Sequence, residues 1–188
     1  SFPLLWIISI LPFRLFYWFS DCIYFVVYYI IGYRKKIVRY NLSIALPHLT
    51  EEKRLIIEKK FYQHMCDMFL EMIKTMSISS AEMNKRFVIT NIDLIKEYEQ
   101  KEKSIILLAS HYASWEWLLS INERTKFKCI GVYKKINNRY FDALVRRIRS
   151  KFDSELVTTN KTIALIAENQ EKGIMGMYGL ASDQSPQV

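Results

Sequence analysis

The sequence has few of the residues that hold small extracellular or metal-bound folds together. Only three cysteines are spread over 188 residues, and Cys22, Cys66 and Cys129 form no Cys-x-x-Cys pair. An odd, widely spaced set provides no disulfide framework and no zinc motif, and it is typical of a reducing compartment. The three histidines do not cluster with these cysteines either. We therefore predict that the protein binds no metal.

Glycine and proline are also scarce, with five and four residues respectively. No Gly-x-Gly-x-x-Gly and no Walker-type Gly-Lys sequence is present, which argues against nucleotide binding. Disorder is excluded by composition, because 51% of the residues are hydrophobic and 14% are aromatic. A chain of this length can bury one real core. These features predict an ordered domain that works without a nucleotide cofactor.

Charge is nearly absent from the start of the chain, where Arg14 and Asp21 are the only charged residues among the first 31. Pro12 divides this region into Phe2–Leu11, which is too short to span a bilayer, and Leu15–Ile31, which is a marginal span. Aromatic residues are dense there, and basic residues follow at Arg34, Lys35, Lys36 and Arg39. This pattern predicts a membrane anchor over residues 1–33, with the remainder on the cytoplasmic side.

Two alternatives to a membrane anchor are a buried helical hairpin and a secretory signal. The signal is disfavoured, because no basic region precedes the apolar run and no small-residue cleavage site follows it. Whether the anchor spans the bilayer or lies in one leaflet stays open.

A helical layer is expected over residues 40–86. Thr50 is placed to begin a long helix, with Glu51 and Glu52 in the first turn. An apolar stripe follows at helical spacing and predicts core packing: Phe61, Met65, Met68, Phe69, Met72 and Met76. The other face carries His64, Asp67, Glu71 and Lys74. We interpret this face as solvated, in preference to a metal or acid–base site.

Alternating strands and helices are predicted from residue 87 onward. Apolar runs indicate strands at Phe87–Ile89, Ser104–Ala109, Lys128–Tyr133, Glu155–Val157 and Ile174–Tyr178. Helical patterns separate them at Ile92–Gln100, Ser114–Glu123, Arg139–Phe152 and Lys161–Lys172. This alternation predicts an α/β fold, a mainly parallel sheet with helices on both faces, so we assign residues 34–188 to one α/β domain. The chain begins without Met and stops in a loop-like sequence. We therefore expect an N-terminal stub and a C-terminal part of the domain to be missing.

A candidate catalytic pair follows the predicted strand Ser104–Ala109. His111 would lie in the turn after this strand, and Glu116 comes five residues later. If Ser114 caps the next helix, the imidazole and the carboxylate can converge. An imidazole held by a carboxylate at the carboxyl end of a parallel strand is a candidate general base. The alternative is an ordinary turn histidine.

Basic residues gather between Arg124 and Lys151, where ten lysines and arginines face one acidic residue, Asp142. Such a stretch favours phosphates, an acidic protein or an anionic membrane. Asp142 is spaced to pair with Arg146 one turn later. Arg149 lies at the edge of the apolar helix face, so it needs an anionic partner, either a structural carboxylate or a substrate phosphate or oxyanion. Asp183 lies in a loop at another strand's carboxyl end, on the same side as His111.

The order of these motifs resembles the bacterial lipid A biosynthesis (late, secondary) acyltransferases, which are related to the glycerophosphate acyltransferases by a His-x4-Asp/Glu motif. The resemblance rests on Tyr33-Arg-Lys-Lys, Arg39-Tyr-Asn-Leu-Ser-Ile-Ala-Leu-Pro47, Glu71, Ser110-His-Tyr-Ala-Ser-Trp-Glu116, Val132-Tyr-Lys-Lys, the helix from Tyr140 to Arg149, and Ser182-Asp-Gln-Ser-Pro186. It implies transfer of a fatty acyl chain to a hydroxyl of a lipid A precursor at the cytoplasmic face of the inner membrane of a Gram-negative bacterium.

The resemblance also implies roles for individual residues. His111 would act as general base, and Glu116 would fix its tautomer. Arg149 would stabilise the oxyanion or bind a phosphate, and Asp183 would orient the acceptor or an arginine. Arg146, Trp115 and Lys134 are further candidates for substrate binding. No cofactor is implied, because the co-substrate is acyl carrier protein loaded with an acyl chain, or less plausibly acyl-coenzyme A. The acidic carrier would dock on the basic stretch.

Two departures from the family pattern are visible. The motif commonly reads Gly-Asn-Trp-Glu, whereas this chain has Ala113-Ser114-Trp115-Glu116, which makes the turn before the helix less permissive. The family also continues beyond position 188 with further strand and helix units.

Three rival functions deserve comparison with acyl transfer to lipid A. One is a non-catalytic module that binds anionic membranes through its basic helix. Another is acyl transfer to a different glycolipid or aminolipid. Nucleic-acid binding is disfavoured, because no known motif is present and the aromatic residues gather at the N-terminus, away from the basic ones.

Overall fold

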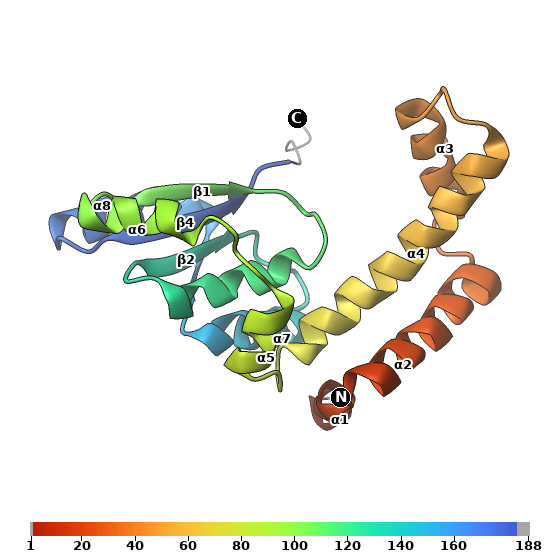
Figure 1. Cartoon of the computed structure of the whole chain (residues 1–188), viewed down its shortest axis with the longest axis horizontal. Coiled ribbons are helices and arrows are strands. Elements are labelled where there is room, and N and C mark those ends of the chain that lie inside the picture. Colours follow the sequence, from red (N-terminus) through yellow and green to blue (C-terminus); the bar gives the residue numbers. More distant parts are fainter. Residues whose placement is uncertain (1, 184–188) are drawn as a thin grey trace. The chain divides into compact units, whose positions relative to one another are not determined.

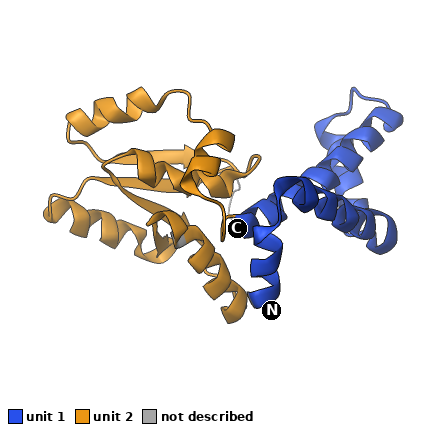
Figure 2. Ribbon diagram, turned by 60° about the horizontal axis from the view of Figure 1, so that its bottom comes forward, with its two compact units in different colours: residues 1–74 blue, residues 75–188 orange. Residues whose placement is uncertain are grey.

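The computed structural model describes residues 2–183, and the chain divides into two compact units, residues 1–74 and residues 75–188 (Figure 2). The boundary between the units falls after Lys74 rather than after residue 33, where the predicted anchor ends. The reason is that the long fourth helix packs along the first helices and forms one unit with them.

Unit 1 is entirely helical (Figure 1). It consists of α1 (Phe2–Ile10), α2 (Phe13–Phe25), the π-helical turn η1 (Val26–Ile31), α3 (Lys35–Ala45) and α4 (Glu51–Lys74). Pro12 immediately precedes α2, and its missing amide hydrogen costs nothing there. Gly32 ends η1 with a φ of +66°, a conformation that glycine adopts without penalty. Thr50 precedes α4 and accepts a hydrogen bond from the Lys53 amide, so the predicted helix start is confirmed.

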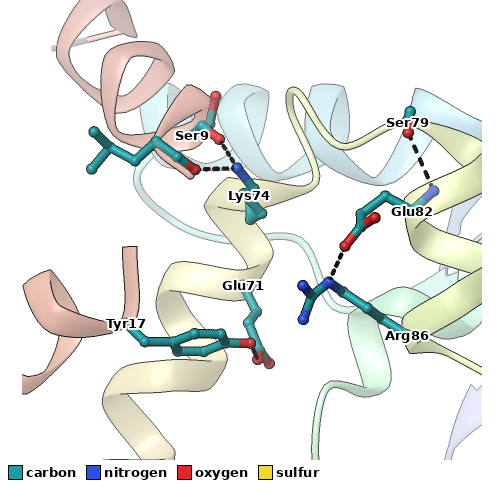
Figure 3. Close-up of polar contacts among 8 residues, drawn as sticks. Ser9, Tyr17, Glu71, Lys74, Ser79, Glu82 and Arg86 are labelled. Atoms are coloured by element: carbon teal, nitrogen blue, oxygen red, sulfur yellow. Dashed lines mark hydrogen bonds and ion pairs between the residues drawn. The ribbon is translucent and has the colours of Figure 1, made fainter. Parts of the chain in front are cut away.

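Most of the α4 face that we expected to be solvated is instead covered by the first two helices, although His64 on this face is exposed. Lys74 is buried, and its Nζ donates to the backbone oxygens of Ser9 and Leu11 at 2.7 and 2.6 Å (Figure 3). The Tyr17 hydroxyl donates to Glu71 at 2.6 Å. The prediction was therefore wrong for Asp67, Glu71 and Lys74.

Two residues of the predicted apolar stripe of α4 are exposed, although core packing was expected for them. Phe61 is 45% exposed and Phe69 is 56% exposed, although Met72 is buried. Periodicity separates the two faces of a helix, but it does not tell which face a neighbouring helix covers. Here Tyr17, Ser20 and the backbone oxygens of Ser9 and Leu11 supply partners for the polar face.

Unit 2 contains a four-stranded sheet whose paired strands all run parallel, in the order β1-β4-β2-β3. The strands are β1 (Ile105–Ala109), β2 (Lys128–Tyr133), β3 (Glu155–Thr158) and β4 (Gly176–Ala181). The predicted α/β class with a parallel sheet is confirmed. The predicted strand at Phe87–Ile89 is wrong. This segment ends a helix, since the Phe87 amide still donates to Met83, and its carbonyl accepts from Arg124.

Helices cover both faces of the sheet, as predicted (Figure 1). Unit 2 has α5 (Ser80–Arg86), α6 (Ile92–Gln100), the 3₁₀ segment η2 (Trp115–Arg124), α7 (Arg139–Arg149), η3 (Ser150–Phe152), η4 (Thr159–Lys161) and α8 (Thr162–Glu171). Ser79 caps α5 by accepting from the Glu82 amide, and Glu82 in turn binds Arg86 at 2.6 Å (Figure 3).

Alternate residues of the central strands β2 and β4 enter two separate cores, whereas one face of the edge strand β1 is exposed. Cys129 and Met177 pack with Ile121 of η2 and with the isoleucines of α6. Their neighbours Ile130 and Tyr178 turn to the other face and pack against α8. This two-sided burial explains the continuous apolar runs in the sequence. Burial also raises the pKa of the Cys129 thiol to about 12, so this cysteine behaves as a core residue.

Candidate active site

His111 and Asp183 meet at one edge of the sheet. Strands β1 and β4 are direct neighbours, with Ala109 opposite Ala181, so the residues that follow them emerge side by side. The Asp183 carboxylate accepts from the His111 backbone amide at 3.0 Å and lies 2.8 Å from the ring atom Nδ1. The sequence placed both residues on this side of the sheet but did not indicate that they pair.

The contact with Asp183 fixes how the imidazole can work. Hydrogen bonds from the His111 side chain and backbone lower the pKa of the Asp183 carboxyl, so it is ionised at neutral pH and only accepts hydrogen bonds. The proton of a neutral imidazole therefore resides on Nδ1, and Nε2 carries the lone pair. Both side chains are 35% exposed, which leaves the ring open to a second molecule. This geometry suits a general base.

Glu116 has a different partner from the one its spacing suggested. Its two oxygens accept from Nε and Nη2 of Arg149, at 2.7 and 2.5 Å. Glu116 and Arg149 are only 11% and 13% exposed. The structure shows no hydrogen bond between His111 and Glu116, so a direct His–Glu pair stays a prediction. For Arg149, the structure supplies the first of the two expected partners, a carboxylate of the protein itself.

Trp115 lies between these two pairs. Its ring meets the His111 ring edge to face, with centroids 5.0 Å apart, and the Arg149 guanidinium carbon lies 5.0 Å from the Trp115 ring. A guanidinium over an indole face is held by the ring quadrupole. Trp115 therefore connects the exposed His111–Asp183 pair to the buried Glu116–Arg149 pair.

The turn that separates the two pairs is strained. Ala113 has a φ of +50°, a left-handed conformation that costs a residue with a Cβ roughly 1–2 kcal/mol. This is the position where the family motif commonly has glycine, so the less permissive turn expected from the sequence has a structural counterpart. Ser114 occupies the N-cap position of η2, but its side chain makes no capping hydrogen bond.

An apolar cavity of about 70 Å³ opens beside these residues. Ala109 and Ala181, at the ends of β1 and β4, line it together with Trp115 and Arg149. The rest of its lining comes from the sheet and η2, including Leu107, Leu118, Cys129, Tyr133, Met177 and Leu180. The polar site therefore borders an apolar space within the same unit.

The remaining predicted residues lie near the same edge but have no contact with His111. Lys134 directly follows β2 and is exposed, and Arg146 is exposed on α7. The predicted Asp142–Arg146 pair is absent. Asp142 is buried and accepts from the Ile136 amide at 3.0 Å, because the loop before α7 folds back over the helix start.

Part of the basic stretch is used inside the fold. Arg124 binds Asn84 and the Phe87 carbonyl, Lys128 pairs with Glu155, and Arg149 pairs with Glu116. The side chains of Lys126, Lys134, Lys135 and Arg146 remain exposed. Among residues 2–183, no three His, Cys, Asp or Glu side chains come together in a way that could hold a metal ion.

Comparison with known protein families identifies the class. Residues 2–186 match the bacterial lipid A biosynthesis acyltransferases, and because this covers nearly the whole chain, the protein belongs to that family. No curated protein matches the chain. Membership assigns an acyltransferase with an acceptor of lipid A type, in a family that is typically membrane-associated. Within the described chain one helical stretch, Phe13–Ile31, has the length and apolar composition needed to cross a membrane.

Proposed function

We propose that the protein transfers a fatty acyl chain from acyl carrier protein to a hydroxyl of a lipid A precursor, at the cytoplasmic face of the inner membrane. The observation that carries this proposal is the position of His111. It lies at the carboxyl end of β1, with Nδ1 held by Asp183 and an apolar cavity beside it.

In this reaction Nε2 of His111 removes the proton of the acceptor hydroxyl while its oxygen attacks the thioester carbonyl. The tetrahedral intermediate then collapses, the carbon–sulfur bond breaks, and the imidazolium returns the proton to the departing thiolate. The Asp183 carboxylate stabilises the imidazolium that forms between these steps. No acyl-enzyme intermediate is needed. The apolar cavity gives the acyl chain a place out of water.

Glu116 acts through Arg149 in this proposal. A guanidinium next to the reacting carbonyl would stabilise the negative charge that develops on its oxygen. Glu116 holds that guanidinium with two hydrogen bonds, and Trp115 supports it from the side of His111. The sequence-based hypothesis differs, because in it Glu116 holds His111 directly.

The proposal that acyl carrier protein is the acyl donor rests on three exposed basic residues near the carboxyl edge of the sheet, Lys134, Lys135 and Arg146. An acidic carrier protein is attracted by such a patch, and attraction of this kind mainly raises the association rate. Reversing the charge at Lys134 and Arg146 should therefore raise KM for acyl carrier protein by about tenfold.

The test is an acyl-transfer assay on the full-length gene product in membranes. Acyl carrier protein loaded with an acyl chain and a tetra-acylated lipid A precursor are supplied, and products are followed by mass spectrometry. We expect a product heavier by one acyl group, with His111→Ala slower by about 10²–10⁴-fold. If His111→Ala formed as much product as the wild type, His111 would not be the general base. No product from a folded, membrane-bound protein would shift the proposal to another glycolipid or to a non-catalytic module.

A further inference from the structure

Inside unit 1, α2 and η1 are joined to α4 by polar contacts along their whole length. The Ser20 hydroxyl donates to Asp67 at 2.6 Å, and the Tyr28 hydroxyl donates to Glu58 at 2.9 Å. Gln63 of α4 donates to Asp21, and Glu71 accepts from Tyr17. Lys74 donates to the backbone of Ser9 and Leu11 (Figure 3). The helix that is apolar enough to span a bilayer is therefore bound on one side to a polar helix.

The opposite side of the same helices is apolar and exposed. On α2 and η1, between 41% and 69% of each of these side chains is exposed: Leu15, Trp18, Phe25, Val26, Tyr29, Ile30 and Ile31. Helix α1 adds Leu4, Trp6, Ile7 and Ile10, and α3 adds Ile37, Tyr40 and Ile44. We call these residues the apolar face. A continuous series of this kind is too extensive for a protein surface in water, so it marks an interaction surface.

Helix α4 decides how this surface can meet a membrane. It is 24 residues long, about 36 Å, and ten of its residues are acidic or basic. If α2 crossed the bilayer with its contacts intact, α4 would enter the hydrocarbon as well. Each charge near the bilayer centre costs about 2.5–3.5 kcal/mol, so the total cost would far exceed the stability of the unit.

We infer that unit 1 is a monotopic anchor. Helices α1, α2 and η1 lie in the plane of one leaflet, with the apolar face in the lipid and α4 on the water side. A helix with one apolar and one polar face binds membranes in this way. The length and composition of Phe13–Ile31 allow a span, but its polar contacts with α4 oppose one.

The apolar face binds a membrane that contains anionic phospholipid. Residues 2–45 contain five basic residues and one acidic residue, Asp21. The basic residues are Arg14, Arg34, Lys35, Lys36 and Arg39, and four of them follow η1 directly. Arg39 is paired with Glu58 of α4 at 2.8 Å, so the other four are the ones that attract anionic lipid. Anionic lipid attracts such residues by about 1 kcal/mol each near the surface. Aromatic residues such as Trp6, Trp18 and Tyr29 suit the headgroup boundary.

The native cysteines make this arrangement measurable. Cys22 is exposed on α2, one helical turn from Trp18 and from Val26, and so belongs to the apolar side. Cys66 and Cys129 are buried and should not react in the folded protein. Reporter cysteines placed at the exposed positions Arg14 and Lys36, each in a Cys22→Ser background, mark the two ends of the α2–η1 helix.

The experiment labels the full-length protein with a membrane-impermeant maleimide, in spheroplasts and in inverted membrane vesicles. We expect Lys36→Cys to react in inverted vesicles, and neither Arg14→Cys nor Lys36→Cys to react in spheroplasts. Native Cys22 should be protected in both preparations and should react once detergent removes the lipid. A spanning helix would instead expose one end in each preparation and overturn the inference. Protection of Cys22 that persists in detergent would mean that protein, not lipid, covers the face.

The in-plane arrangement rests on the proposed membrane location, and a flotation assay tests that location by itself. The purified full-length protein is mixed with vesicles of phosphatidylcholine, with or without phosphatidylglycerol. Binding should be several-fold stronger with phosphatidylglycerol, and Lys35→Glu with Lys36→Glu should remove that difference. Failure to float on either vesicle would defeat the proposed location. Equal flotation on both kinds of vesicle would mean that the apolar face does not require anionic lipid.

Discussion

Two carboxylates lie close to the same edge of the sheet, and they differ in nearly every physical respect. Asp183 and His111 are 35% exposed and open to a second molecule. Glu116 and Arg149 are 11% and 13% exposed and make two parallel hydrogen bonds. An exposed pair contributes little to stability, whereas breaking a buried pair is costly. The comparison favours the exposed pair as the proposed site of proton transfer, and it indicates that the buried pair fixes the position of the Arg149 guanidinium.

The largest expected effect follows from removing the acceptor that orients His111. In Asp183→Asn the side-chain amide can donate to Nδ1, which favours the wrong tautomer and no longer stabilises the imidazolium. We expect kcat to fall by about 10²–10⁴-fold, with a Tm close to that of the wild type. The measurement is the acyl-transfer assay, run beside a thermal melt. Asp93→Asn, in an exposed pair with Lys96, is the matched control and should change neither quantity.

If Asp183→Asn lowered the Tm and left kcat unchanged, the assignment of roles to the exposed and buried pairs would be reversed. The exposed pair would then be structural, and His111 would need another partner during catalysis.

The next effect is on stability. Glu116→Gln leaves the Arg149 guanidinium partly buried without its counter-charge, so we expect a loss of about 3 kcal/mol in the free energy of unfolding. Chemical denaturation measures it. Glu97→Gln, which removes an exposed pair with Lys101, should cost under about 1 kcal/mol. Replacing both partners, as Glu116→Gln with Arg149→Met, should recover much of the loss, because no unpaired charge remains.

Glu116→Gln also distinguishes the two mechanisms. If Glu116 holds His111 directly in the working enzyme, as the sequence suggested, this variant should lose activity as Asp183→Asn does and keep its stability. That result would restore the His–Glu pair.

The secondary structure of unit 2 was largely predictable, because its helices and strands have regular apolar periods. The bounds Lys128–Tyr133 and Ile92–Gln100 coincide with β2 and α6. The pairing of site residues was not predictable in the same way. Asp183 reaches His111 because β4, the last strand of the described chain, inserts beside β1, and adjacency of this kind is not written in the order of the strands.

The sequence also did not show which side of α4 is covered by other helices. Lys74, Asp67 and Glu71 have the spacing of a solvated face, yet they bind the first two helices. Charged residues are buried where another segment supplies matched partners, and those partners lie 47 to 65 residues away. Spacing within one helix contains no information on such distant partners.

A smaller effect is expected in the turn that separates the two pairs. Ala113→Gly removes the strain of a left-handed φ, which outweighs the extra freedom that glycine gives the unfolded chain. We expect a gain of about 0.5–1 kcal/mol in the free energy of unfolding. Ala143→Gly is the matched control in α7, where the same change should cost about 1 kcal/mol. Losses at both positions would show that the turn is unstrained.

The smallest expected effect concerns pH and separates Asp183 from ordinary surface carboxylates. Hydrogen bonds from His111 lower the folded-state pKa of Asp183. A lowered pKa gives stability that is fully present above the unfolded-state value, about 4, and is lost as pH falls through the folded-state value. The Tm difference between wild type and Asp183→Asn should therefore be small and constant at neutral pH, should begin to shrink below about pH 4, and should vanish once the pH falls below the folded-state pKa of Asp183. Thermal melts across this range measure it. A difference that persists in acid would mean that the pair is held by packing, and the exposed and buried pairs would no longer differ in kind.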